Sequence, residues 1–254
     1  LAVTGDPPSM GPLGSLAQRV TDLKSSVELL RLVRKLREGE LINGDRIADP
    51  PDFCTGATIG WPSPAQVAWL KKKIDAGAEY QGYASDITRT FPINGVYSRE
   101  QRALHDLVEA AQQAAMAQVF PGNAWIAPHD AAVQVLTEGM LRLGLLKGSL
   151  QDAVSKESYR RFYMHKTGHW LGLDVHDVGD YRVGGEHRLL EPGMVLTIEP
   201  GIYIAPGSKG VAQKWQGIGI RIEDDLLVTE HGHKVLSADT PRSADDIEAW
   251  MSAG

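Results

Sequence analysis

The chain has 254 residues, of which 43% are hydrophobic and 23% charged, proportions typical of a globular protein with a substantial core. The net charge of −6, with no basic block beyond residues 71–73, argues against a nucleic-acid partner. No apolar run reaches the length of about 18 residues that a membrane-spanning helix needs. The single cysteine, Cys54, cannot form an internal disulfide, which favours a cytoplasmic location, with the mitochondrion as the alternative.

The N-terminal third of the chain is expected to contain a disordered segment, one helix and an irregular stretch. Residues 1–17 are rich in Gly, Pro and Ser, and we expect a disordered lead-in that is not a signal peptide. Apolar residues recur at helical spacing over residues 18–38 and predict an amphipathic helix. Pro and Gly then interrupt residues 40–66 too often for long elements.

Residues 74–91 read as a β-hairpin that brings two carboxylates together. If the turn is centred between Tyr80 and Gln81, Asp75 lies directly opposite Asp86. Opposed residues on antiparallel strands lie about 4.5–5.5 Å apart. Two carboxylates at that distance repel each other unless a cation lies between them. The spacing therefore predicts a metal ion at this pair.

Two helices and a series of strands are expected next. Ser98 and Gln101 have the spacing of a capping box, which predicts a helix over residues 102–119 that ends at Pro121-Gly122. A second helix is expected over residues 128–143, closed by Gly144. Short apolar segments then predict antiparallel strands over residues 170–175, 194–198, 202–205, 217–222 and 226–229. Two helices followed by a run of strands predict an α+β architecture.

Four carboxylates and one histidine in apolar-flanked segments form the candidate metal site. A carboxylate between apolar strand residues is expected to be buried, and a buried charge must be paired or bound to a metal. Each residue taken alone is more often a surface, turn or core group. Together they need about four positive charges, which two divalent ions supply. The predicted ligands are Asp75, Asp86, His169, Glu199 and Glu223.

The chemistry of this set suits hydrolysis. Oxygen ligands with a single imidazole suit Mn²⁺, Co²⁺, Mg²⁺ or Zn²⁺ better than a metal that prefers thiolates. Two such ions can share a water, lower its pKa and polarise a carbonyl. Glu199, beside Pro200 at an expected strand end, is the candidate base for the proton of that water. His165 and His176 are expected to hydrogen bond a peptide carbonyl and a developing oxyanion.

The histidine spacing leaves two geometries open. His165 and His169 are four residues apart, as in a helical metal pair, but Gly168 weakens that interpretation. In an extended segment they share one face and His176 lies on the other, unless the chain bends at Gly168 or Gly172.

Several neighbouring residues have plainer interpretations. The plainer interpretation of Arg221, two residues before Glu223, is a simple strand ion pair. Asp224 and Asp225 are expected to be a solvated acidic strand end. Trp170 and Tyr203 are expected in the core rather than in contact with substrate.

Five motifs closely resemble the catalytic domain of Xaa-Pro aminopeptidases (aminopeptidase P) in order and spacing. The motifs are IDAG at 74–77, SDITRTFP at 85–92, GHWLGLDVHDVG at 168–179, GMVLTIEPGIYI at 193–204 and GIRIEDD at 219–225. The resemblance covers roughly residues 74–250 and implies the pita-bread fold of a metallopeptidase. We place that domain at residues 18–254, with residues 40–73 atypical and shortened.

The resemblance also implies a division of the ligands between two metal ions. By position, Asp75 would bind one ion, commonly Mn²⁺, with Co²⁺ or Zn²⁺ as alternatives. Asp86 and Glu223 would bridge both ions, and His169 and Glu199 would hold the other.

The implied reaction is removal of an N-terminal residue when proline is second, by a hydroxide that bridges the metals. His165 and His176 would contact substrate, and Arg221 would support a ligand. The partners would be peptides, and a homo-oligomer is admitted. The alternatives are a prolidase, which cleaves only dipeptides, and a catalytically impaired metal-binding isoform. The latter is favoured by the shortened residues 40–73 and by the absence of a histidine before His105.

Overall fold

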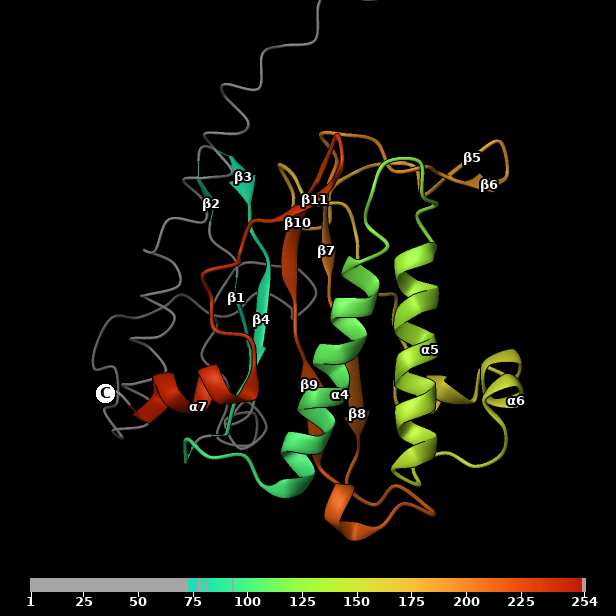
Figure 1. Ribbon diagram of the computed structural model, residues 1–254, viewed down its shortest axis with the longest axis vertical. Coiled ribbons are helices and arrows are strands. Elements are labelled where there is room, and N and C mark those ends of the chain that lie inside the picture. The colour runs from blue at the N-terminus through green and yellow to red at the C-terminus, as the bar shows by residue number, and fades with distance from the viewer. Residues whose placement is uncertain (1–72, 77–78, 81, 93, 253–254) are drawn as a thin grey trace, which may run out of the picture.

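The computed structural model describes residues 73–76, 79–80, 82–92 and 94–252 of the chain. The expected lead-in at 1–17, the helix at 18–38 and the shortened stretch through residue 72 lie outside the described residues. Figure 1 shows long helices standing against a group of antiparallel strands. None of the described helices has the length and apolar character needed to cross a membrane.

The two long helices are α4 (Arg99–Met116) and α5 (Ala127–Arg142), which lie side by side and antiparallel (Figure 1). The predicted capping box is confirmed, because Ser98 Oγ accepts from the Gln101 N–H and the Gln101 side chain accepts from the Ser98 N–H. Helix α4 therefore begins three residues earlier than predicted, directly after its cap. It packs against the strands that carry the candidate site.

The strands form short antiparallel ladders. They are β1 (Lys73–Ala76) with β4 (Ile87–Thr90), β2 (Glu79–Tyr80) with β3 (Tyr83–Ala84), β5 (Arg182–Val183) with β6 (Glu186–His187), β8 (Gly201–Ile204) with β9 (Ile218–Arg221), and β7 (Val195–Ile198) and β11 (Gly232–Val235) on either side of β10 (Asp224–Thr229). Strand β4 lies next to β9 and β10 without forming a ladder with either (Figure 1).

Four of the five predicted strands are confirmed, and the one over residues 170–175 is wrong. In that segment only Trp170 forms a bridge, to Leu196 of β7. The remaining elements were not predicted. Besides β5, β6 and β11 they are α6 (Leu150–Ser155), α7 (Ala244–Ser252) and two 3₁₀ turns, η1 (Ser158–Arg161) and η2 (Gln213–Trp215).

The hairpin is confirmed, but its register differs from the prediction. Tyr80 pairs with Tyr83, so the turn is centred one residue later, and Asp75 lies opposite Thr88 rather than Asp86. The reason is Gly82, whose φ of +85° is a left-handed conformation that glycine adopts without steric cost and that belongs in a turn. A shift by two positions keeps 75 and 86 in the same phase of the strand alternation. The side chain of Asp75 lies outside the described side chains.

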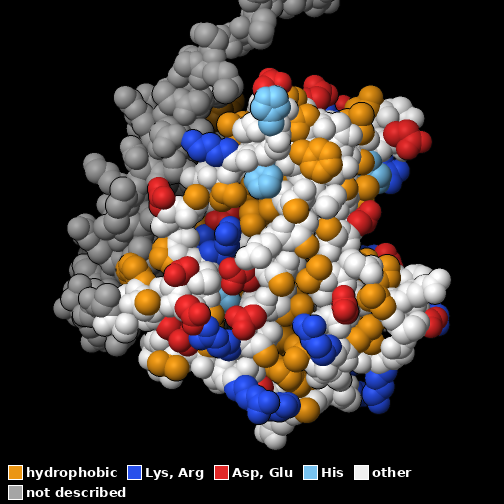
Figure 2. All heavy atoms as spheres, in the orientation of Figure 1, with side chains coloured by type: hydrophobic (Ala, Val, Ile, Leu, Met, Phe, Trp, Pro, Cys, Tyr) orange, Lys and Arg blue, Asp and Glu red, His pale blue; other side chains and the backbone are white. Residues whose placement is uncertain are grey.

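The hydrophobic core lies between the helices and the strands. Helices α4 and α5 contribute Leu104, Val108, Leu136 and Met140, all fully buried. Trp170 is buried in this core, as predicted. Figure 2 shows acidic and basic side chains interspersed over the described part of the helical face, with apolar ones between them. The strand ends behind this helical layer hold the candidate site.

Candidate metal centre

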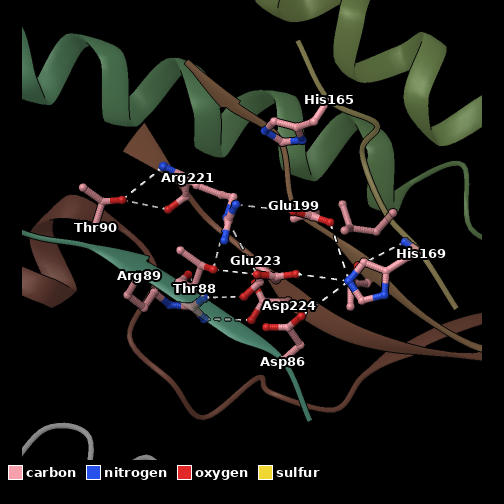
Figure 3. Close-up of polar contacts among 12 residues, drawn as sticks. Asp86, Thr88, Arg89, Thr90, His165, His169, Glu199, Arg221, Glu223 and Asp224 are labelled. Carbon is pink, nitrogen blue, oxygen red and sulfur yellow. Dashed lines mark hydrogen bonds and ion pairs between the residues drawn. The ribbon is translucent and has the colours of Figure 1, made fainter. Parts of the chain in front are cut away.

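Three predicted ligands converge where the ladders meet (Figure 3). Asp86 directly precedes β4, Glu223 lies between β9 and β10, and His169 follows an irregular segment bonded to β7. One ligand atom of each lies within 4.8 Å of the others, and all three residues are buried. The segments that place them are more than 50 residues apart in sequence, so the convergence is produced by the fold.

His169 is oriented by its own backbone neighbourhood. Its Nδ1 lies 2.9 Å from the carbonyl oxygen of Trp170. A carbonyl can only accept, so Nδ1 carries the proton and the Nε2 lone pair points the other way. Nε2 faces Asp86 Oδ2 at 3.4 Å, Glu199 Oε1 at 3.6 Å and Glu223 Oε1 at 3.9 Å. A lone pair surrounded by three carboxylates is a place for a positive charge.

The electrostatics of the site show the same demand. Burial lowers the pKa of His169, but Asp86, the Trp170 carbonyl and Glu199 outweigh burial and raise it. Burial, with Glu199 and Asp86 adding to it, raises the pKa of Glu223 well above its ordinary value. The isolated protein side chains therefore favour binding a proton, and a divalent cation would satisfy the same excess of negative charge.

Of the two carboxylate oxygens of Glu223, one accepts a hydrogen bond and the other does not. Its Oε2 accepts a 2.5 Å hydrogen bond from Thr88 Oγ1, while its Oε1 is buried with no hydrogen-bond partner among the described residues and faces His169. An unpartnered buried carboxylate oxygen costs free energy unless something binds it. Together with the oxygen and imidazole donor set, this unpartnered carboxylate oxygen shows that the residues present fit a divalent metal ion.

Glu199 lies at a strand end, as predicted. It follows β7 directly, and its N–H donates to the Thr167 carbonyl at 2.7 Å. Its carboxylate lies 3.8 Å from the Arg221 guanidinium on one side and 3.6 Å from His169 on the other. It therefore borders the converging group and lies within reach of any cation bound there.

Arg221 contacts the ligand set. Its Nε lies 3.9 Å from Glu223 Oε2 and donates to Thr88 Oγ1 at 3.3 Å. Burial lowers its pKa, with Glu223 opposing the change. Both carboxylates near it, Glu223 and Glu199, are predicted ligands. Arg221 therefore forms a strand ion pair, and its partners in that pair are the predicted ligands themselves, so the ion pair and the support of a ligand are the same contact.

His176 lies against His169 because the chain bends. The two rings are 4.3 Å apart between centroids and meet edge to face. The bend is at Gly172, where a Cβ would come within 1.8 Å of Asp177 Oδ2, so a side chain at this position would require Asp177 to move. Asp177 also donates its N–H to the Trp170 carbonyl. The bend brings His176 to the exposed edge of the site and explains why the predicted strand is absent.

His165 is held by a tyrosine. Its Nδ1 lies 2.7 Å from the Lys166 carbonyl and its Nε2 lies 2.8 Å from the Tyr203 hydroxyl. By the same reasoning as for His169, Nδ1 carries the proton and Tyr203 donates to Nε2. Tyr203 was expected only to fill the core, but its half-buried ring ends in this hydrogen bond. The i, i+4 helical pair does not form, since the segment holding His165 and His169 is irregular.

The prediction that Asp224 and Asp225 are solvated is wrong, because they are 0% and 3% exposed. Asp224 accepts from Arg89 at 2.7 Å and from Ser237 at 2.6 Å. Asp225 accepts from the Asp86 N–H at 3.1 Å. The partners of Asp224 are distant in sequence and satisfy its charge. Asp225 keeps one buried carboxylate oxygen without a hydrogen-bond partner among the described residues, and burial raises its pKa well above the ordinary value.

Thr88 and Arg89 were not predicted to belong to the site. The available signal was the run Thr88-Arg89-Thr90, three polar residues in a β-hairpin strand that turns out to be buried on both faces. A buried polar strand must find partners. Which partners could not be read from the sequence.

The sequence matches a protein-family model and several known proteins. Residues 57–230 match Metallopeptidase family M24. The chain is 49% identical over 179 residues to "Xaa-Pro aminopeptidase" of Haemophilus influenzae, covering 70% of this chain and 41% of that protein. It therefore spans less than half the length of this relative.

Two solved structures show the same fold. Aminopeptidase PepP of Pseudomonas aeruginosa matches with a TM-score of 0.71 and 56% identity, covering 71% of this chain and 41% of that one. Zn-substituted aminopeptidase P of Escherichia coli in complex with product matches with a TM-score of 0.69 and 46% identity, over 71% and 41%. The predicted pita-bread, α+β fold is confirmed. Because the family match covers more than half of the sequence and spans all five predicted ligands, the chain belongs to metallopeptidase family M24.

Proposed function

We propose that this chain is the catalytic part of a metal-dependent aminopeptidase that removes an N-terminal residue preceding proline. The observation that carries the proposal is the buried convergence of Asp86, His169 and Glu223 within 4.8 Å, with Glu199 beside them. The Xaa-Pro aminopeptidases to which the chain is similar supply the substrate class.

We propose a centre of two divalent ions, Mn²⁺ first, with Co²⁺ or Zn²⁺ as alternatives. Asp75, Asp86, His169, Glu199 and Glu223 would hold them. When bound, such ions lower the pKa of a water and polarise the scissile carbonyl. The carboxylate-rich donor set supports a hard or borderline cation, and a site of this kind follows metal availability as well as affinity.

The other residues would handle substrate and protons. Glu199, kept close to the positive charge of Arg221, would accept the proton released during hydrolysis. His176, at the exposed edge, would donate to the developing oxyanion. His165, oriented by Tyr203, would face the peptide beyond the scissile bond.

The test is an assay of the purified 254-residue chain, loaded with Mn²⁺, on an Xaa-Pro-Xaa tripeptide, an Xaa-Pro dipeptide and an Xaa-Ala-Xaa control. Cleavage of the first alone supports the proposal. Cleavage of the dipeptide alone identifies a prolidase. No cleavage of either, with two metal ions bound per chain, identifies the metal-binding isoform and rejects both enzymes.

Location and assembly belong to the same proposal. The single Cys54 supports a cytoplasmic location, and fractionation of the source cell tests this location. A homo-oligomer is tested by light scattering of the purified chain at two concentrations.

A further inference from the structure

We infer that the buried ion pair between Arg89 and Asp224 is a clamp that sets the spacing of the metal ligands Asp86 and Glu223. The inference rests on the proposed metal site. It assigns a positioning role to two residues that lie behind that site and do not face it.

The need for a clamp follows from the sheet topology. Asp86 precedes β4, which forms its ladder with β1, and Glu223 precedes β10, which forms its ladder with β7 and β11. No ladder joins β4 to β9 or β10 in the described chain. One backbone hydrogen bond, from the Glu223 N–H to the Thr88 carbonyl at 3.0 Å, crosses directly at the ligand. Side chains must therefore supply most of the connection.

Strand alternation divides those side chains between two faces. Thr88 and Thr90 lie on the metal side, where Thr88 donates to the Glu223 carboxylate and Thr90 Oγ1 bonds the backbone of Arg221. Arg89 lies on the opposite side, together with Asp224. The contact of β4 with β9 and β10 is consequently made by threonine hydroxyls on one side of β4 and by the Arg89–Asp224 ion pair on the other (Figure 3).

The guanidinium of Arg89 uses all three of its nitrogens. Nη1 donates to the carbonyl of Glu223 at 2.7 Å and to that of Thr88 at 2.9 Å. Nη2 donates to Asp224 Oδ1 at 2.7 Å, and Nε donates to the Pro241 carbonyl at 2.6 Å. One rigid planar group thus holds the backbone of Glu223, the carboxylate of Asp224 and strand β4, which follows Asp86.

Asp224 is fixed in turn by two neutral donors and a second arginine. Its Oδ1 accepts from Ser237 at 2.6 Å, and its Oδ2 accepts from Gln112 of α4 at 2.9 Å and from Arg242 Nη1 at 3.4 Å. The carboxylate is fully buried, and Arg89 is 5% exposed. The pair is therefore shielded from solvent and cannot rearrange without breaking several bonds. A shift of Arg89 would move the Glu223 carbonyl directly.

The test compares Mn²⁺ binding to the metal-free 254-residue chain by calorimetry with the visible absorption of the Co²⁺-loaded chain. Arg89→Lys keeps the charge but loses the planar fork. We expect it to weaken Mn²⁺ binding at least tenfold and to shift the Co²⁺ bands, since residues that orient metal ligands typically contribute about 10- to 100-fold to affinity. Asp224→Asn should weaken binding similarly. The double variant should lose no more than the worse single one, because the two residues act as a unit.

A matched control separates positioning from general stability. Leu136→Ala removes a fully buried core side chain of α5, and we expect it to lower Tm while leaving Mn²⁺ affinity within about twofold. If Arg89→Lys does not fold, Ser237→Ala removes one donor to Asp224 and should weaken Mn²⁺ binding by about fivefold.

The outcomes distinguish the two proposals. A wild-type chain that binds neither Mn²⁺ nor Co²⁺ overturns the proposed metal site, and the clamp falls with it. A wild-type chain that binds, while Arg89→Lys or Ser237→Ala binds within twofold of it, overturns the clamp alone. So does a Leu136→Ala chain that loses as much affinity as Arg89→Lys, or a double variant whose losses simply add.

Discussion

His105 makes the protein sensitive to acid at a position outside the metal centre. Its side chain is 0% exposed within α4, and neither ring nitrogen has a hydrogen-bond partner among the described residues. The ring packs against Tyr97 at 4.9 Å between centroids. Burial, followed by the charges of Arg89 and Arg102, lowers the pKa of His105 to about 4. Folding therefore holds this imidazole in its neutral form.

The size of the effect follows from the difference between the folded and unfolded pKa values. Between pH 6.5 and about 4 the unfolded chain binds a proton at His105 that the folded chain excludes, so stability falls as the pH falls. At about 1.36 kcal/mol per pKa unit, the full difference corresponds to about 3 kcal/mol. Replacing His105 by Leu removes this contribution and also removes two unsatisfied buried nitrogens.

The assay is urea unfolding of the metal-free chain and of His105→Leu between pH 7 and pH 4, followed by tryptophan fluorescence. The variant should be at least as stable as the wild type at pH 7, and its advantage should grow by about 3 kcal/mol on going to pH 4. Burial also lowers the pKa of His129 to about 4, but His129 is present in both proteins and cancels. Parallel stability curves across this range would refute the reasoning.

Three further predictions concern the site. Glu223→Gln should lower the bound Mn²⁺ by at least one ion per chain, measured by atomic emission, and two retained ions would contradict its assignment as a ligand. Tyr203→Phe removes the hydrogen bond to His165 and should lower kcat/KM about tenfold at unchanged Mn²⁺ affinity, so an unchanged rate would count against an orienting role. Gly172→Ala places a Cβ against Asp177 and should impair turnover more than metal binding; equal activity would show that the bend tolerates a side chain.

Local signals in the sequence predicted the elements that depend on neighbouring residues. The capping box at Ser98 set the start of α4, and short apolar segments between Gly and Pro residues located four of the five expected strands. The register of the hairpin was missed because it depends on where a single left-handed residue, Gly82, falls in the turn. A difference of one residue in the turn moves every pairing by two positions.

The site was predictable in its chemistry and not in its supporting contacts. Charged residues between apolar strand residues are expected to be buried, and buried carboxylates need a cation nearby. This reasoning was enough to select Asp86, His169 and Glu223. Asp224 was misjudged because its partner Arg89 is 135 positions away, and no local pattern distinguishes a solvated aspartate from one that meets a distant arginine. Contacts of that kind are known only once the fold is known.

The separation of the ladders also affects how metal binding is coupled to folding. Thr88 and Glu223 are 135 positions apart, and the ligands Asp86 and Glu223 lie beside strands β4 and β10, which belong to different ladders. An unfolded chain offers these donors far apart, with a large loop to close before two of them can share an ion. A cation should then bind the native state almost alone and stabilise it by nearly the full concentration-dependent amount, about 2.7 kcal/mol at a hundred times Kd. The ion would behave as a late-formed cross-link, and its loss would loosen the protein first along the line between β4 and β10.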